Sequence, residues 1–162
     1  MTHLSHILNF RQVNDRITLS GQPTEDQLAV LAKDGVTHVI NLGPHHNKGA
    51  LDDEAASVTT LGMEYIYIPV EFESPTEEDF TQFCAALEGL PTQRVHVHCI
   101  YNARVTAFFY RYAKSGRGRL DPTEAFEMMD GIWRPGNDWA DFIDHPEAKG
   151  EPNRFNGFDY ES

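Results

Sequence analysis

The sequence predicts an α/β domain of three layers, in which a central, mostly parallel sheet is flanked by helices. Short β-rich segments alternate with segments of helical periodicity as far as about residue 115, and helices follow. The length of 162 residues favours one domain over 1–162. Its core is expected over about 10–145, because residues 147–162 form a polar tail rich in Gly, Asn and Pro.

The first half of the chain is predicted to contain three strands separated by two helices. A capping box of Thr24 and Gln27 starts the first helix, since each side chain can accept from the other residue's backbone N–H. Pro69 marks the end of the third strand, because proline lacks the N–H that a sheet requires. The predicted elements are a strand over 17–20, a helix from 24 to about 35, a strand over 36–42, a helix over 52–61 and a strand over 65–70.

The second half contains one more predicted strand and four helices. Thr76 and Asp79 form a second cap, and Pro122 after Asp121 occupies the first position of a later helix, where its missing N–H costs nothing. The predicted elements are a helix from 76 to about 90, a strand over 94–98, and helices over 104–114, from 122 to about 133, and over 137–143.

The charge of the chain restricts its partners. It carries 25 acidic and 13 basic side chains, a formal net charge of −12. A nucleic-acid binder or a protein held on an anionic membrane needs basic surface, so we expect neither partner. No apolar stretch approaches the roughly 20 residues of a membrane-spanning helix. Two cysteines are too few for a disulfide scaffold, and the N-terminus lacks the pattern of a signal peptide, so a cytoplasmic location is expected.

The segment after the strand over 94–98 carries the predicted chemistry. Cys99 ends that strand, and the next helix begins near Arg104. A loop in this place points backbone N–H groups at one spot beside the positive end of a helix dipole, which favours an anion and a thiolate. Asn102 tolerates a left-handed backbone, and Arg104 offers a planar fork of donors for phosphate oxygens. The predicted phosphate-binding loop consists of Ile100, Tyr101, Asn102, Ala103 and Arg104.

The arrangement His98-Cys99-x4-Arg104 after a valine-rich strand resembles the cysteine-dependent phosphatases of the tyrosine and dual-specificity type. Within them it is most similar to the bacterial phosphatase-like group that includes the domain fused to beta-lactamase-like hydrolases. The resemblance covers roughly residues 10–145 and implies a phosphotyrosine-phosphatase-like fold. Further matching segments are Ser20–Pro23, Val39–Leu42 and Ile68–Glu71.

The loop departs from the family pattern in its length. The family has five residues between Cys and Arg, with a glycine among them, whereas here there are four and Asn102 stands near the place of the glycine. If the loop is simply shorter, Arg104 faces the anion and Val105 replaces the hydroxyl residue that assists the leaving thiolate. If the helix keeps the standard register, Thr106 supplies that hydroxyl and Arg104 is rotated by about 100°. We favour the shorter loop, since it gives the phosphate a charge partner.

The resemblance implies a mechanism and its residues. Cys99 would attack phosphorus to form a phosphocysteine, and a carboxylic acid would protonate the leaving oxygen and then activate water. In the family this acid, generally Asp, lies after the preceding strand, where Glu71 is our first candidate and Glu73 the second. His98 is expected to orient the loop by hydrogen bonding.

A metal and other cofactors are not expected. His96 and His98 share one face of a strand, but within a sheet buried on both faces they are predicted to be hydrogen-bonded core histidines. The substrate is predicted to be a phosphorylated small molecule or a phosphoprotein, with a compact phosphate group, because the net charge of −12 repels polyanions. Two alternatives stay open: a rhodanese-like sulfurtransferase with a persulfide on Cys99, and an inactive phosphate-binding module.

Overall fold

A five-stranded sheet in the order β1-β2-β5-β3-β4 forms the centre of the computed structural model, which describes residues 4–117, 120–133 and 137–143. The predicted tail over 147–162 lies outside these residues. Strands β2, β5, β3 and β4 run parallel, and β1 pairs antiparallel with β2 at one edge. The strands are β1 (Arg11–Gln12), β2 (Ile17–Ser20), β3 (His38–Asn41), β4 (Glu64–Tyr67) and β5 (Val95–His98).

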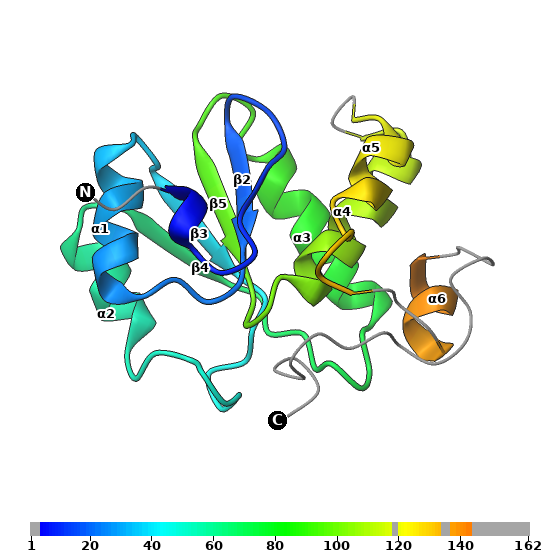
Figure 1. Ribbon diagram of the computed structural model, residues 1–162, viewed down its shortest axis with the longest axis horizontal. Coiled ribbons are helices and arrows are strands. Elements are labelled where there is room, and N and C mark those ends of the chain that lie inside the picture. Colours follow the sequence, from blue (N-terminus) through cyan, green and yellow to red (C-terminus); the bar gives the residue numbers. More distant parts are fainter. Residues whose placement is uncertain (1–3, 118–119, 134–136, 144–162) are drawn as a thin grey trace.

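Helices cover both faces of the sheet (Figure 1), which confirms the predicted three layers. On one side lie α1 (Glu25–Lys33) and α2 (Glu54–Thr60), with the short 3-10 helix η1 (Leu4–His6) beside α1. On the other side lie α3, α4 and α5, and α6 packs against α4. The bounds of these helices are α3 (Glu77–Glu88), α4 (Ala103–Lys114), α5 (Pro122–Glu127) and α6 (Asn137–Ile143).

The two sides of the sheet have different cores. The side of α1 and α2 is mainly aliphatic, whereas the other side is rich in aromatic rings that meet edge to face, an arrangement that suits their quadrupoles. Strand β5 lies between the two cores, and all four of its residues are buried. The first core contains Ile7, Leu28, Leu31, Val36, Val39, Val58 and Met63, and the rings of the second include Phe72, Phe80, Phe83, Phe108, Phe109, Trp133 and Trp139.

Local sequence signals set most of the element boundaries. Both capping boxes are present: Thr24 with Gln27 starts α1, and Thr76 with Asp79 starts α3. The strand over 17–20 and the helix over 137–143 have the predicted bounds. The other two predicted strands of the first half are shorter than expected, over 38–41 and 64–67, although main-chain hydrogen bonds continue beyond them, as from Val70 N to Leu42 O at 2.9 Å.

Two further details differ from the prediction. The helix predicted from Pro122 to about Trp133 ends at Glu127, and turns follow. In these turns Gly131 has φ of 82°, a left-handed conformation that interrupts a helix, and Ile132 and Trp133 are buried in the aromatic core. The edge strand β1 was not predicted, because two residues carry no periodicity.

Within the ranges that the structure describes, no helix has the length and apolar character needed to cross a membrane.

Candidate active site

Cys99 lies directly after β5, at the start of the loop that leads into α4. The backbone N–H of Asn102 donates to Cys99 Sγ at 3.2 Å. Asn102 has φ of 74°, the left-handed conformation expected for it, and α4 begins at the next residue. The loop therefore turns back on the sulfur and places it at the N-terminal end of a twelve-residue helix, where a thiolate is favoured.

Two segments that precede β3 hold this loop in place. Asn9 and Asn102 face each other: Asn102 Nδ2 donates to Asn9 O at 2.7 Å, and Asn9 Nδ2 donates to Tyr101 O at 2.9 Å. The Gln22 N–H donates to Ile100 O at 2.9 Å. A Cβ on Gly21 would lie 2.6 Å from Ile100 O, so this close approach requires glycine. The Gly in the segment Ser20–Pro23 thus has a structural reason, whereas the role of Asn9 was not predicted.

Arg104 extends from the first turn of α4 to the segment that follows β4. Its Nη1 donates to Val70 O at 2.7 Å, and its guanidinium carbon lies 6.0 Å from the centre of the Phe72 ring. Neither Arg104 nor Cys99 has exposed surface. A phosphate can therefore reach the sulfur only after some covering group moves.

Thr106, the alternative source of a hydroxyl, bonds within its own helix. Its Oγ1 donates to the carbonyl oxygens of Asn102 at 2.8 Å and Ala103 at 3.0 Å, and accepts from Trp133 Nε1 at 3.2 Å. This hydroxyl fastens the first turn of α4 to the segment after α5.

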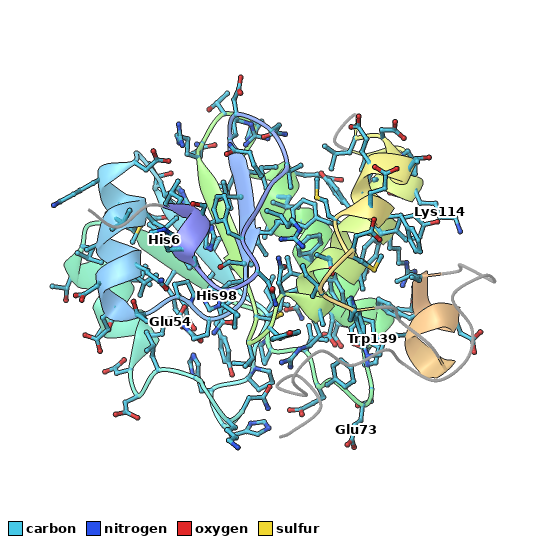
Figure 2. The ribbon with its side chains drawn as sticks, viewed as in Figure 1. His6, Glu54, Glu73, His98, Lys114 and Trp139 are labelled. Atoms are coloured by element: carbon cyan, nitrogen blue, oxygen red, sulfur yellow. The ribbon has the colours of Figure 1, made fainter. Side chains whose placement is uncertain are left out.

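The two predicted acids, Glu71 and Glu73, lie on the segment that follows β4, and both are exposed. Glu71 Oε1 is 3.5 Å from His46 Nε2. The backbone on either side of Glu71 is fixed, because Val70 O accepts from Arg104 and Phe72 O accepts from Trp139 Nε1 at 2.7 Å. Figure 2 shows Glu73 at the outer end of this segment, away from His98. The structure thus brings the backbone of this segment to Arg104, while the carboxylates face solvent.

His98 connects the Cys99 loop to a buried carboxylate. Its Nδ1 bonds to Cys99 O at 2.9 Å, and its Nε2 lies 2.5 Å from Glu54 Oε2. Glu54 is 1% exposed and also accepts from Gln22 Nε2 at 2.8 Å. Burial raises the pKa of Glu54, but the positive charge of His98 and the hydrogen bonds from His98 and Gln22 outweigh burial, so its pKa is lower than usual. Sequence reasoning missed Glu54, because a glutamate in the first turn of a helix is ordinarily solvated.

His96, the other histidine of β5, is a hydrogen-bonded core residue. Its Nδ1 lies 2.7 Å from Thr18 Oγ1, and its Nε2 lies 2.7 Å from Ser20 Oγ. Since the Ser20 hydroxyl donates to Gly21 O, it accepts from His96 Nε2, and in a neutral ring Nδ1 accepts from the Thr18 hydroxyl. Burial, and then the positive charge of His98, hold the pKa of His96 well below its usual value. Among residues 4–117, 120–133 and 137–143, no three His, Cys, Asp or Glu side chains form a group suited to a metal ion.

Comparisons with known sequences place a related segment inside longer proteins. No family model matches the chain. It is 33% identical over 127 residues to the beta-lactamase hydrolase-like protein of Xylella fastidiosa (strain Temecula1). The match covers 74% of this chain and 28% of that protein, so the chain spans little more than a quarter of the length of this relative.

Comparisons with solved structures cover most of the chain. A DUF442 protein of Shewanella putrefaciens CN-32, described as a candidate phosphatase, is 34% identical, with a TM-score of 0.78 over 90% of this chain and 93% of that one. A cysteine-to-serine variant of TpbA from P. aeruginosa, solved in complex with pTyr, is 18% identical, with a TM-score of 0.62 over 80% of this chain and 75% of that one. At this identity TpbA shows a shared fold.

Proposed function

Because the chain belongs to the DUF442 family of candidate phosphatases, we propose that it is a cysteine-dependent phosphatase that hydrolyses a phosphomonoester. The observation that carries the proposal is the hydrogen bond of 3.2 Å from the Asn102 N–H to Cys99 Sγ. An amide donor at a helix N-terminus stabilises a thiolate, the nucleophilic form of cysteine, and the following amides suit the oxygens of a phosphate.

The proposed reaction has two steps. The Cys99 thiolate attacks phosphorus, the bond from phosphorus to the ester oxygen breaks, and Glu71 gives its proton to that oxygen. The resulting phosphocysteine is attacked by water, which loses a proton to the same carboxylate, and inorganic phosphate leaves as the thiolate is restored. Glu73 is the second candidate for this acid, since it lies two residues further along the same exposed segment.

Arg104 would supply the charge that binds the phosphate. Since the chain carries a net charge of −12, attraction for an anion must come from groups at the site itself. The loop amides and the guanidinium of Arg104 are such groups, and they suit a compact phosphate rather than a polyanion. A phosphotyrosine-type substrate fits this requirement, and a neighbour of the same fold, TpbA, was solved with pTyr.

Hydrolysis of an aryl phosphate tests the proposal. We expect Cys99→Ser to reduce the release of phosphate to background, because serine is not ionised at neutral pH. Cys84→Ser is the matched control: this second cysteine lies buried on α3, and its replacement should change the rate by less than about twofold. Equal hydrolysis by the wild-type protein and the Cys99→Ser variant would contradict the proposal.

Sulfur transfer is the second candidate function, because the four-residue spacing between Cys99 and Arg104 also fits a rhodanese-like loop. A persulfide on Cys99 after treatment with thiosulfate, without hydrolysis of aryl phosphates, would favour it. Binding of phosphate without either reaction would indicate an inactive binding module.

A further inference from the structure

A buried carboxylate close to the nucleophile is not used by the proposed reaction. Glu54, the first residue of α2, is 1% exposed and lies 44 residues before His98 in the chain. Figure 2 shows the two side chains next to each other. Burial of an ionised carboxylate is costly unless charged and hydrogen-bonded partners compensate it. The pairing with His98 therefore accounts for the burial of Glu54.

The directions of the hydrogen bonds indicate where the protons lie. Cys99 O accepts, so His98 Nδ1 carries a proton. Gln22 Nε2 donates to Glu54 Oε1 at 2.8 Å, so this carboxylate oxygen accepts as well. The remaining contact joins Glu54 Oε2 to His98 Nε2 at 2.5 Å and contains one proton. An imidazole is a stronger base than a carboxylate, and the environment lowers the pKa of Glu54 further, so that proton lies on Nε2 and both nitrogens of His98 donate.

The geometry points to Glu54 as a positioning residue that keeps His98 an imidazolium against Cys99 and thereby makes the Cys99 thiol more acidic. The cation lies between the carboxylate and the cysteine, because its Nε2 faces Glu54 and its Nδ1 faces the carbonyl of Cys99. The nearer charge dominates, so the pair favours the thiolate. A more acidic Cys99 thiol matters for catalysis only if Cys99 is the nucleophile, so this part of the inference rests on the proposed function.

Other charged or titratable groups surround the pair. Tyr65 from β4 is one of them, because burial and, in smaller part, the charge of Glu54 raise the pKa of its phenol. His96 from β5 is neutral and bonded to two hydroxyls. Arg104 from α4 bonds to Val70 O on the other side of the loop. His45, from the segment after β3, contributes to the lowered pKa of Glu54. Its Nε2 bonds to Tyr65 Oη at 2.7 Å. Of these groups, His98 bonds directly to the backbone of Cys99, so a shift in the pKa of the thiol would be assigned to the pair of Glu54 and His98.

Glu54→Gln isolates the charge, because a neutral network can keep each of these hydrogen bonds. The new amide can accept from Gln22 through its oxygen and donate to His98 Nε2, while Nδ1–H still donates to Cys99 O. We expect the pH midpoint for alkylation of Cys99 by iodoacetamide, followed peptide by peptide with mass spectrometry, to rise by about one pH unit. Below both midpoints alkylation should be about tenfold slower.

The matched control is Glu64→Gln. Glu64 pairs with His38 at 2.9 Å in the same kind of contact, but its side chain is largely exposed. This variant should leave the midpoint for Cys99 unchanged. An unchanged midpoint in Glu54→Gln, or an equal shift in the control, would overturn the inference.

A measurement on the wild-type protein keeps the inference testable if Glu54→Gln does not fold. Nitrogen NMR of the histidine rings should show both His98 nitrogens protonated at pH 7, and a neutral His98 would refute the inference. Alkylation and NMR need no phosphate ester. Failure of the proposed phosphatase activity and failure of the Glu54 role are therefore separate results.

Discussion

The two sides of the Cys99 loop are built from different chemistry. Toward α2 the contacts are between polar side chains: buried His98 and Glu54 and half-buried Gln22 form a chain of hydrogen bonds. Toward α4 and α6 a guanidinium and aromatic rings surround Phe72, and Arg104 and Trp139 donate to main-chain carbonyl oxygens. Figure 2 shows Glu54 and His98 close together and Trp139 on the far side. We call these the polar side and the aromatic side.

The polar side controls the charge next to Cys99, whereas the aromatic side controls the position of the segment that carries Glu71. On the polar side a proton lies between two titratable groups, so a substitution there changes the charge next to the sulfur. On the aromatic side the donors Arg104 and Trp139 do not gain or lose protons near neutral pH. They fix backbone atoms of the segment that carries Glu71. We therefore expect changes on the polar side to alter pH dependence, and changes on the aromatic side to alter substrate binding and proton transfer.

The largest effect is expected from the aromatic side, with Arg104→Lys. Lysine keeps the positive charge but loses the planar fork, so kcat/KM for an aryl phosphate should fall about 100-fold, the cost of one preorganised donor group. Steady-state kinetics measure this, with the thermal unfolding midpoint as a check on folding. Arg111→Lys on the same helix is the control, since Arg111 bonds to exposed Glu77, and a similar loss there would contradict the special role of Arg104.

Trp139→Phe tests whether the aromatic side positions Glu71, because it removes the donor to Phe72 O and keeps an aromatic ring. If this bond positions Glu71, hydrolysis of phenyl phosphate should fall about tenfold, while 2,4-dinitrophenyl phosphate, whose leaving group needs no proton, should change little. Glu71→Gln should show the same selectivity. Trp133→Phe, which loses a bond to Thr106 instead, is the control. Equal losses for both substrates would mean that Trp139 does not act through the acid.

The smallest effect concerns the stability of the folded protein toward acid, and it depends on His96, which lies beside His98 on β5. The folded state holds the pKa of His96 well below its usual value of 6.5, through burial and then through His98. Below pH 6.5 the unfolded chain therefore binds a proton that the folded protein does not, and stability falls by up to about 1.4 kcal/mol per pH unit. Denaturant unfolding between about pH 7 and 5 measures this slope.

His96→Asn should reduce this slope, and His46→Asn, at an exposed position, should not. An unchanged slope in His96→Asn would show that another group controls the acid sensitivity.

The sequence predicted most of the fold because its signals are local. The side chains of Thr24 and Thr76 reach backbone groups three residues away, so both capping boxes depend on a single turn of chain. The mismatch at the end of α5 has the opposite cause. Residues 128–133 retain helical spacing of apolar residues, but Trp133 reaches Phe72 and Thr106 from a turn rather than from a helix.

The candidate site was predictable where its residues are adjacent in the chain. Cys99, Asn102 and Arg104 fall within six positions, and the strand before them and the helix after them bring their backbone together. Glu54 and Trp139 lie 45 residues before and 40 residues after Cys99. A glutamate in a first turn and a tryptophan on a short helix have ordinary structural explanations, and no spacing rule connects either of them to the loop.

By itself the sequence determined the parallel α/β order, the caps of the helices and the loop between β5 and α4, because each depends on contacts along a short length of chain. The tertiary structure decided what surrounds that loop. It buried Glu54 against His98, placed Arg104 on Val70 O and fixed Phe72 O with Trp139. These contacts join segments that meet when the two helical layers close over the sheet, and burial there makes their hydrogen bonds and charges strong.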